Sequence, residues 1–248
     1  MRWNFSSATR KGDKRSVNQD RSNIVDLANG HVAIVCDGHG FGNYAVDFCV
    51  KALSQKLFHI RPETAQEQLM AIFKEVGEEA STFDSGTTAS VACLWNNGKV
   101  HTAVLGDSMI VAGNPKRAHR QLSSHHNVRT NLSERSAAEA RGGKYQQMYL
   151  YNPKIRNSGG LQLGRAFGDY DLLGVLSTQP DLMRFTAESG TWVVVMSDGI
   201  YDPSVPSRGK DMEELGLMMD KGATAEDLVA HFQPNKGDDA TAVVARFT

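Results

Sequence analysis

Aspartates at the ends of apolar segments are the residues of this chain whose type and spacing suggest chemistry. Five of them stand directly before or after a segment typical of a buried strand: Asp20, Asp37, Asp107, Asp198 and Asp238. A carboxylate beside a buried strand loses its hydration, which is costly unless a partner replaces the water. Few lysines or arginines stand beside these positions. We therefore expect the carboxylates to converge on cations.

Oxygen ligands of this kind suit Mg²⁺ or Mn²⁺ rather than Zn²⁺, which favours His and Cys. Acidic residues around shared hard cations are typical of phosphoryl chemistry, in which two metal ions hold the nucleophile and the phosphate oxygens. A single Asp-Gly pair, such as Asp37-Gly38, is most simply a turn; the recurrence at five places favours a metal site. Arg15 could bind a phosphate through two parallel hydrogen bonds, although its spacing within the basic run 10–15 alone favours a solvated charge.

The elements that must carry these residues follow from turn signals and hydrophobic periodicity. Asn-Gly pairs at 29–30 and 97–98 supply the positive φ angles of tight hairpin turns. Thr64 and Glu67 fit a capping box at the start of a helix. The first half is predicted to contain strands at 21–28 and 31–36, helices at 44–58 and from residue 64, strands at 87–95 and 100–105, and a further strand at 109–112.

The second half begins with a polar stretch rich in His, Arg, Asn and Ser at about 114–160, which we interpret as a flap outside the main sheet. After it we expect strands at 192–196 and 241–247, with two short helices at 212–219 and 224–232 between them; the flap itself holds one at 133–141. Short strands dominate and helices come in pairs. This pattern favours an α+β layered sandwich over a doubly wound parallel sheet.

Composition limits the class of protein. The 248 residues are 40% hydrophobic, enough for a substantial core, and we expect one domain over 1–248. The balance of 27 basic against 28 acidic residues argues against nucleic-acid and membrane-surface binding. No apolar run approaches the roughly 20 residues of a spanning helix, and the N-terminus shows no signal peptide. Three widely spaced cysteines are interpreted as buried thiols in a reducing, cytoplasmic compartment.

Seven motifs in register resemble those of the metal-dependent protein serine/threonine phosphatases of type 2C. In chain order they lie at 15–20 (RSVNQD), 37–40 (DGHG), 85–89 (SGTTA), 106–108 (GDS), 163–169 (LGRAFGD), 197–199 (SDG) and 238–241 (DDAT). The resemblance covers essentially the whole chain. It implies a four-layer α-β-β-α sandwich: a central antiparallel β-sandwich flanked by paired helices, with a binuclear Mn²⁺ or Mg²⁺ centre at one end.

The resemblance also assigns roles to individual residues. Asp37 matches the aspartate that bridges both metals, and Gly38 the glycine whose carbonyl is a ligand. Asp198 and Asp238 match ligands of single metals, Asp20 a residue that binds metal-bound water, and Asp107 a ligand of a weaker third metal found in some members. Arg15 matches the phosphate-binding arginine, and His39 the histidine proposed as general acid.

The function implied is hydrolysis of phosphoserine and phosphothreonine by in-line attack of a metal-bridging hydroxide, without a phosphoenzyme. The expected partners are phosphoproteins that a Ser/Thr kinase has modified, and we expect a monomer. Departures from the family pattern are modest: Gln19 replaces a frequent glutamate, Phe41 a glycine, and Ser124 an acidic residue before His125. None removes an expected metal ligand.

Two other functions fit the sequence less well. A non-catalytic binding module on the same fold would be expected to lose Asp37, Asp198 or Asp238, and all three are present. A cysteine phosphatase needs Arg six positions after Cys, and no cysteine here has one. Asp169 and Arg165 are interpreted as residues that fix a loop. His125 and His126 are expected to be solvated in the flap.

Overall fold

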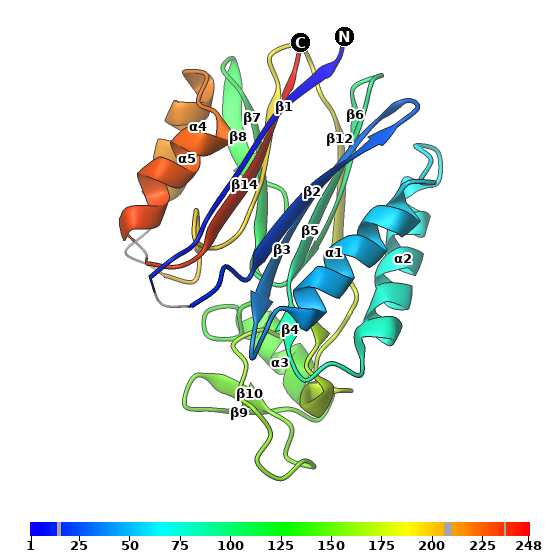
Figure 1. The fold of residues 1–248 in the computed structure, drawn as a ribbon, viewed down its shortest axis with the longest axis vertical. Coiled ribbons are helices and arrows are strands. Elements are labelled where there is room, and N and C mark those ends of the chain that lie inside the picture. Colours follow the sequence, from blue (N-terminus) through cyan, green and yellow to red (C-terminus); the bar gives the residue numbers. More distant parts are fainter. Residues whose placement is uncertain (14–15, 206–209, 236) are drawn as a thin grey trace.

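Two antiparallel sheets packed face to face form the centre of the fold (Figure 1). The computed structural model describes residues 1–13, 16–205, 210–235 and 237–248. The first sheet has the order β1-β14-β13-β7-β8, formed by Trp3–Arg10 (β1), Ala240–Phe247 (β14), Trp192–Met196 (β13), Met109–Asn114 (β7) and Arg117–Gln121 (β8). The second has the order β11-β4-β3-β5-β6-β12, and β2 also pairs with β3; its strands are Asp20–Leu27 (β2), Gly30–His39 (β3), Gly86–Thr87 (β4), Ala89–Trp95 (β5), Lys99–Leu105 (β6), Phe167–Gly168 (β11) and Asp181–Thr186 (β12).

Both faces of each sheet are apolar, because successive side chains of a strand pack against different layers of the fold. In β3, Ile34 packs among the residues of two helices, whereas Val35, the next residue, packs against the opposite sheet. In β13, Val194 packs on the side of the helices and Val195 packs against the opposite sheet. Successive side chains of a strand point to opposite faces, so a strand in a middle layer must be apolar throughout.

Two pairs of helices cover the outer faces. The helices α1 (Tyr44–Leu57) and α2 (Ala65–Ala80) lie on the sheet that contains β3, and α4 (Asp211–Asp220) and α5 (Ala225–Phe232) lie on the other sheet (Figure 1). Phe73 of α2 and Phe232 of α5 are buried against their respective sheets. The predicted four-layer α-β-β-α arrangement is therefore confirmed.

The flap lies at the end of the sandwich opposite the two chain termini (Figure 1). It contains the helix α3 (Leu132–Ala140) and the small hairpin of β9 (Lys144–Gln146) and β10 (Tyr149–Tyr151). A separate apolar cluster around Ala138 and Leu150 forms its interior. The flap leads through β11 and the short 3-10 helix η1 (Tyr170–Leu172) back to the sheet; a second such turn, η3 (Gln233–Asn235), follows α5.

Several sequence-based expectations need correction. The edge strands β1 and β12 were not predicted, so Asp20 opens the second strand of the chain rather than preceding the first. The excursion begins after β8, which pairs with β7 as part of the sheet, and not at residue 114. The Thr64 hydroxyl lies 3.2 Å from Gln68 Oε1 and makes no capping box, whereas Thr224 makes a complete one with Asp227.

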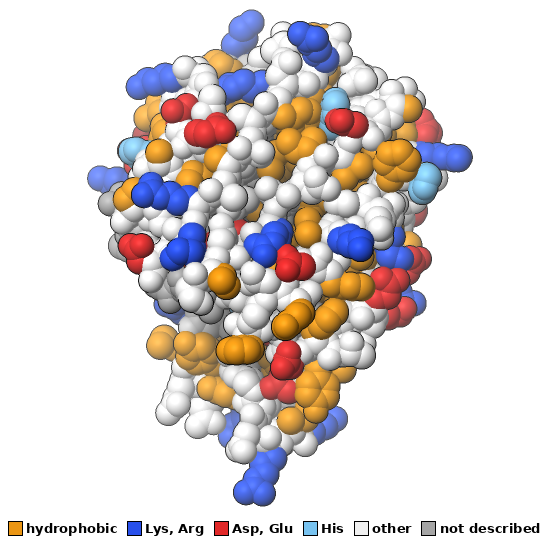
Figure 2. Space-filling view, in the orientation of Figure 1, with side chains coloured by type: hydrophobic (Ala, Val, Ile, Leu, Met, Phe, Trp, Pro, Cys, Tyr) orange, Lys and Arg blue, Asp and Glu red, His pale blue; other side chains and the backbone are white. Residues whose placement is uncertain are grey.

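The surface and thiol chemistry agree with the composition. On the face shown in Figure 2, basic and acidic side chains are interspersed and do not gather into areas of one sign. Cys36, Cys49 and Cys93 are buried free thiols, as predicted. No helix in the described part of the chain is long and apolar enough to cross a membrane.

Candidate active site

A cavity of about 270 Å³ lies between the end of the sandwich and the flap. The sandwich contributes most of the residues that the sequence singled out: Asp37, Gly38, His39, Asp107, Asp198 and Asp238. The flap contributes the facing wall, which includes Asn127, Arg129 and Tyr149. The cavity thus brings together carboxylates from distant parts of the chain.

Each carboxylate reaches the cavity because a strand ends there. Asp37 lies near the end of β3, where Thr88 Oγ1 accepts a hydrogen bond from its backbone N–H at 3.0 Å. Asp107 lies in the connection between β6 and β7, and Asp198 follows β13. Asp238 precedes β14 in the other sheet from Asp37. Strand ends of both sheets therefore place acidic side chains around one cavity.

Asp20 stands behind this set, in register with Asp37 across the β2–β3 pair. It is 2% exposed, and its Oδ2 accepts a hydrogen bond of 2.7 Å from Ser197, whereas its buried Oδ1 has no hydrogen-bond partner among the described residues. The neighbouring Asp239 has a different task. Its two oxygens accept hydrogen bonds from the backbone N–H groups of Gly12 and Gln19, which ties the N-terminal segment to the start of β14.

The carboxylates oppose one another electrostatically. Withdrawal from water, followed by repulsion from Asp20 and Asp198, raises the pKa of Asp37 well above its usual value. Burial and repulsion from Asp107 raise the pKa of Asp198 in the same way, and burial raises that of Asp20 to about 6. Within the described residues, no lysine or arginine forms an ion pair with Asp20, Asp37, Asp107 or Asp198.

These observations fit hard cations. The donor set consists of oxygens, and Asp20 Oδ1 lacks a partner. A cation would remove the repulsion that raises the carboxylate pKa values. In the described part of the chain, no three Asp, Glu, His or Cys side chains are already gathered closely enough to form a ligand cluster. The carboxylates surround the cavity rather than meeting at one point.

His39 also lines the cavity, and its ring is held by a partner that no local sequence pattern indicates. His39 Nε2 lies 2.8 Å from Oδ2 of Asp169, which follows β11. Arg165, which was expected to fix the same loop with Asp169, instead pairs with Glu134 of α3 and Asp181 of β12. The two residues of this loop therefore have separate roles.

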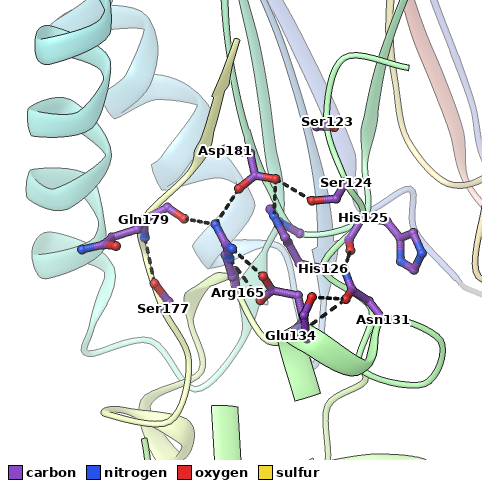
Figure 3. A network of polar contacts seen from close by, with 12 residues as sticks. Ser123, Ser124, His125, His126, Asn131, Glu134, Arg165, Ser177, Gln179 and Asp181 are labelled. Atoms are coloured by element: carbon purple, nitrogen blue, oxygen red, sulfur yellow. Dashed lines mark hydrogen bonds and ion pairs between the residues drawn. The ribbon is translucent and has the colours of Figure 1, made fainter. Parts of the chain in front are cut away.

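The Arg165 pairs belong to a network that fastens the flap to the sandwich (Figure 3). Arg165 Nη1 lies 2.9 Å from Asp181 Oδ1, and its Nε lies 3.1 Å from Glu134 Oε2. His126 is fully buried, in contrast to the solvated position expected for it: its Nδ1 accepts the Gly106 N–H at 3.0 Å and its Nε2 lies 3.2 Å from Asp181 Oδ2.

His125 is partly buried as well, and burial lowers its pKa. Asn127 of the flap contacts the site directly, because its Nδ2 donates a hydrogen bond of 3.1 Å to Asp107 Oδ2. Gln19, at the position of a frequent glutamate, donates to the carbonyl of Gly42 at 2.8 Å and so supports the loop after His39. These contacts link distant segments, and no local sequence pattern marks them.

Two basic residues bear on phosphate binding. Arg15 lies outside the described residues. Arg129 of the flap lines the cavity, and its Nη1 donates to Gln162 Oε1 at 3.3 Å. It is the one lysine or arginine among the described residues that line this cavity. Several other arginines stand in the same polar stretch, so its sequence position alone did not distinguish it.

The sequence is similar to a family model and to curated relatives that are all described as protein phosphatase 2C. The family model described as protein phosphatase 2C matches residues 30–208. Probable protein phosphatase 2C 9 of Arabidopsis thaliana is 36% identical over 164 residues, which cover 65% of this chain and 56% of the relative. Probable protein phosphatase 2C 41 of Oryza sativa subsp. japonica is 34% identical over 170 residues, which cover 65% and 55%. This chain thus spans about half the length of these relatives.

Solved structures share the fold. Serine-threonine phosphatase 2C from Toxoplasma gondii superposes with a TM-score of 0.76 at 19% identity, covering 99% of this chain and 95% of that one. Serine/threonine phosphatase Stp1 from Staphylococcus aureus gives 0.74 at 20% identity, covering 100% and 96%. At such identities the likeness demonstrates the architecture alone.

Proposed function

Since this chain belongs to the protein phosphatase 2C family, we propose that it hydrolyses phosphoserine and phosphothreonine residues of proteins in a metal-dependent reaction. The observation that carries the proposal is the convergence of carboxylates from both sheets on one cavity, where withdrawal from water and repulsion by neighbouring carboxylates raise the pKa values of Asp37 and Asp198. Such a group is stable in its ionised form when cations are bound between its members.

We propose Asp37, the Gly38 carbonyl, Asp198 and Asp238 as the residues that hold two Mn²⁺ or Mg²⁺ ions. Asp107 would contribute to a weaker third site, and Asp20, which is not among the residues that line the cavity, would act through water as the family motif implies. When bound, the cations supply activation of water near neutral pH and neutralisation of phosphate charge. The remaining steps depend on side chains of this chain.

His39 is proposed as the proton donor. A water oxygen forms a new bond to phosphorus while the bond between phosphorus and the serine or threonine oxygen breaks. The electron pair of the broken bond stays on that oxygen, which takes a proton from His39 and leaves as the alcohol. Arg129, on the facing wall, is placed to hold a phosphate or an acidic neighbour of the phosphorylated residue; Arg15 retains the phosphate-binding role implied by the family motif.

The proposal extends to partners and location. The substrates would be proteins phosphorylated by a Ser/Thr kinase, and the enzyme would act as a monomer. Three buried free thiols suit a reducing compartment, which supports a cytoplasmic location.

The test is hydrolysis of p-nitrophenyl phosphate and of a phosphoserine peptide, with Mn²⁺, with Mg²⁺ and with EDTA. We expect activity with either cation and none with EDTA. A protein that binds the phosphopeptide without hydrolysing it in the presence of Mn²⁺ would be a binding module, and the proposal would then be wrong.

A further inference from the structure

One polar contact of His39 is with a carboxylate from a distant part of the chain. Oδ2 of Asp169 lies 2.8 Å from Nε2 of His39, and both side chains are largely withdrawn from solvent, with exposed fractions of 10% and 18%. Asp169 forms no ion pair with a lysine or arginine among the described residues. A buried carboxylate needs a partner, and among the described residues the side chain that supplies one is the imidazole of His39.

Three neighbouring strands, β3, β4 and β11, bring the pair together. In the pairing registers, Gly86 of β4 stands opposite His39 of β3 on one side and opposite Gly168 of β11 on the other. A Cβ atom on Gly86 would overlap both Asp169 Oδ2 and His39 Nε2. Only glycine at this position allows the carboxylate and the imidazole to meet across the strand between them.

The backbone at Asp169 is also unusual. Its φ angle of +54° lies in the left-handed region, which a non-glycine residue enters at a cost. Aspartate tolerates this region when its side chain bonds to the nearby backbone, but here the side chain bonds across the sheet to His39. The backbone N–H of Asp169 donates to the Ser85 carbonyl at 3.1 Å, which holds the residue in place.

We infer that Asp169 is a positioning residue for His39: its carboxylate fixes the rotation of the imidazole ring, so that the ring faces the cavity in one orientation. The inference rests on the proposed function, in which His39 gives a proton to the leaving oxygen. A carboxylate that binds one ring nitrogen fixes both the ring orientation and the nitrogen that carries the proton. The motifs at 85–89 and 163–169 thereby acquire a role at the candidate active site, through Gly86 and Asp169.

The experiment compares two ways of changing Asp169. Asp169→Gly removes the carboxylate and suits the left-handed backbone, so that strain cannot account for a loss of activity. Asp169→Asn keeps a side-chain oxygen that can accept the Nε2–H hydrogen bond. Asp84→Asn, an exposed aspartate of the neighbouring loop, is the matched control.

Rates are measured at saturating Mn²⁺ on a phosphoserine peptide, whose leaving oxygen needs a proton, and on p-nitrophenyl phosphate, whose leaving group does not. We expect Asp169→Gly to lower kcat on the peptide about 10- to 100-fold, with KM and the rate on p-nitrophenyl phosphate changed less than about twofold. Asp169→Asn should restore most of the peptide rate, and Asp84→Asn should behave as the wild type.

A double-mutant cycle separates positioning from a purely structural role. If Asp169 acts through His39, Asp169→Gly should cost nothing further on the peptide when His39→Gln is already present. Losses that multiply in the double variant, or equal losses on both substrates, would overturn the inference. A wild-type protein without Mn²⁺-dependent hydrolysis would instead overturn the proposed function, so the two failures are distinguishable. If Asp169→Gly does not fold, Asp169→Asn and Asp169→Ser are compared instead. A ratio of peptide rate to p-nitrophenyl phosphate rate that stays at the wild-type value in Asn and falls in Ser would support positioning, and a wild-type ratio in both would overturn it.

Discussion

Asp37 reaches the cavity from one sheet and Asp238 from the other, so each tests a different half of the proposed metal site. We expect Asp37→Asn and Asp238→Asn to lose most of the hydrolytic activity at moderate Mn²⁺ while remaining folded. The amide removes one negative charge from the cation ligands and so weakens metal binding. Isothermal titration calorimetry with Mn²⁺ should show an affinity at least about tenfold lower in each variant.

Asp26→Asn is the control for this pair, because Asp26 is an exposed aspartate that pairs with His31 away from the cavity. It should bind Mn²⁺ like the wild type. Wild-type Mn²⁺ affinity in either Asp37→Asn or Asp238→Asn would remove that residue from the proposed ligand set.

The raised pKa of Asp20 predicts how the free energy of unfolding depends on pH. Burial raises its pKa from 3.8 to about 6, so in the metal-free protein its favourable contribution is complete below about pH 4 and is lost as the pH rises through 6. A shift of this size corresponds to about 3 kcal/mol. Free energies of unfolding from urea titrations in EDTA should therefore fall from pH 4 to pH 7 more steeply for the wild type than for Asp20→Asn. Parallel curves would show that Asp20 does not titrate with folding.

At the scale of elements, the network of Arg165 holds α3 of the flap to β12 of the sheet. Glu134 is buried, and removing its partner leaves a charge with little solvent. We expect Arg165→Gln to speed amide hydrogen exchange in residues 128–151 while the strands of the sandwich stay protected. Arg117→Gln breaks an exposed pair with Glu188 and should leave the flap unchanged.

Uniform acceleration of exchange over the whole chain of Arg165→Gln would mean that the flap and the sandwich unfold together. If residues 128–151 of Arg165→Gln exchange as slowly as in the wild type, the apolar cluster around Leu150 is sufficient to hold the flap. Either result would contradict the role given to the network.

The sequence predicted those elements whose signals are local. The β2–β3 hairpin follows from Asn29-Gly30, and β13 from an unbroken apolar run buried on both faces. The edge strands β1 and β12 mix polar with apolar residues because part of their surface faces water, so neither periodicity nor composition marks them. Thr64 carried a local capping signal, but its hydroxyl lies against Gln68 instead.

The same distinction applies to the site. The aspartates could be predicted to lie together because each adjoins a strand end. Two other residues of the site could not: Asn127 of the flap reaches Asp107, and Asp169 after β11 reaches His39, only through pairings between segments far apart in the chain. Burial of His126 likewise depends on the approach of Gly106 and Asp181.

At the scale of the whole molecule, the ends of both sheets meet at the cavity, so metal binding there should stabilise the entire sandwich. A cation that binds only the folded state raises its stability by about 2.7 kcal/mol at a hundredfold excess over Kd. Protons compete with the cation for Asp37 and Asp198, whose pKa values are raised in the metal-free protein. The increase in Tm caused by Mn²⁺ should therefore be larger at pH 7.5 than at pH 5.

Differential scanning fluorimetry at both pH values, with Mn²⁺ and with EDTA, measures this difference. In Asp37→Asn the increase should be much smaller at pH 7.5, because one carboxylate of the set is gone, and Asp26→Asn should respond like the wild type. Cations bound at scattered surface carboxylates would stabilise Asp37→Asn and the wild type alike. An equal increase in the two proteins would therefore show that the carboxylates of the cavity do not form the metal site that links the two sheets.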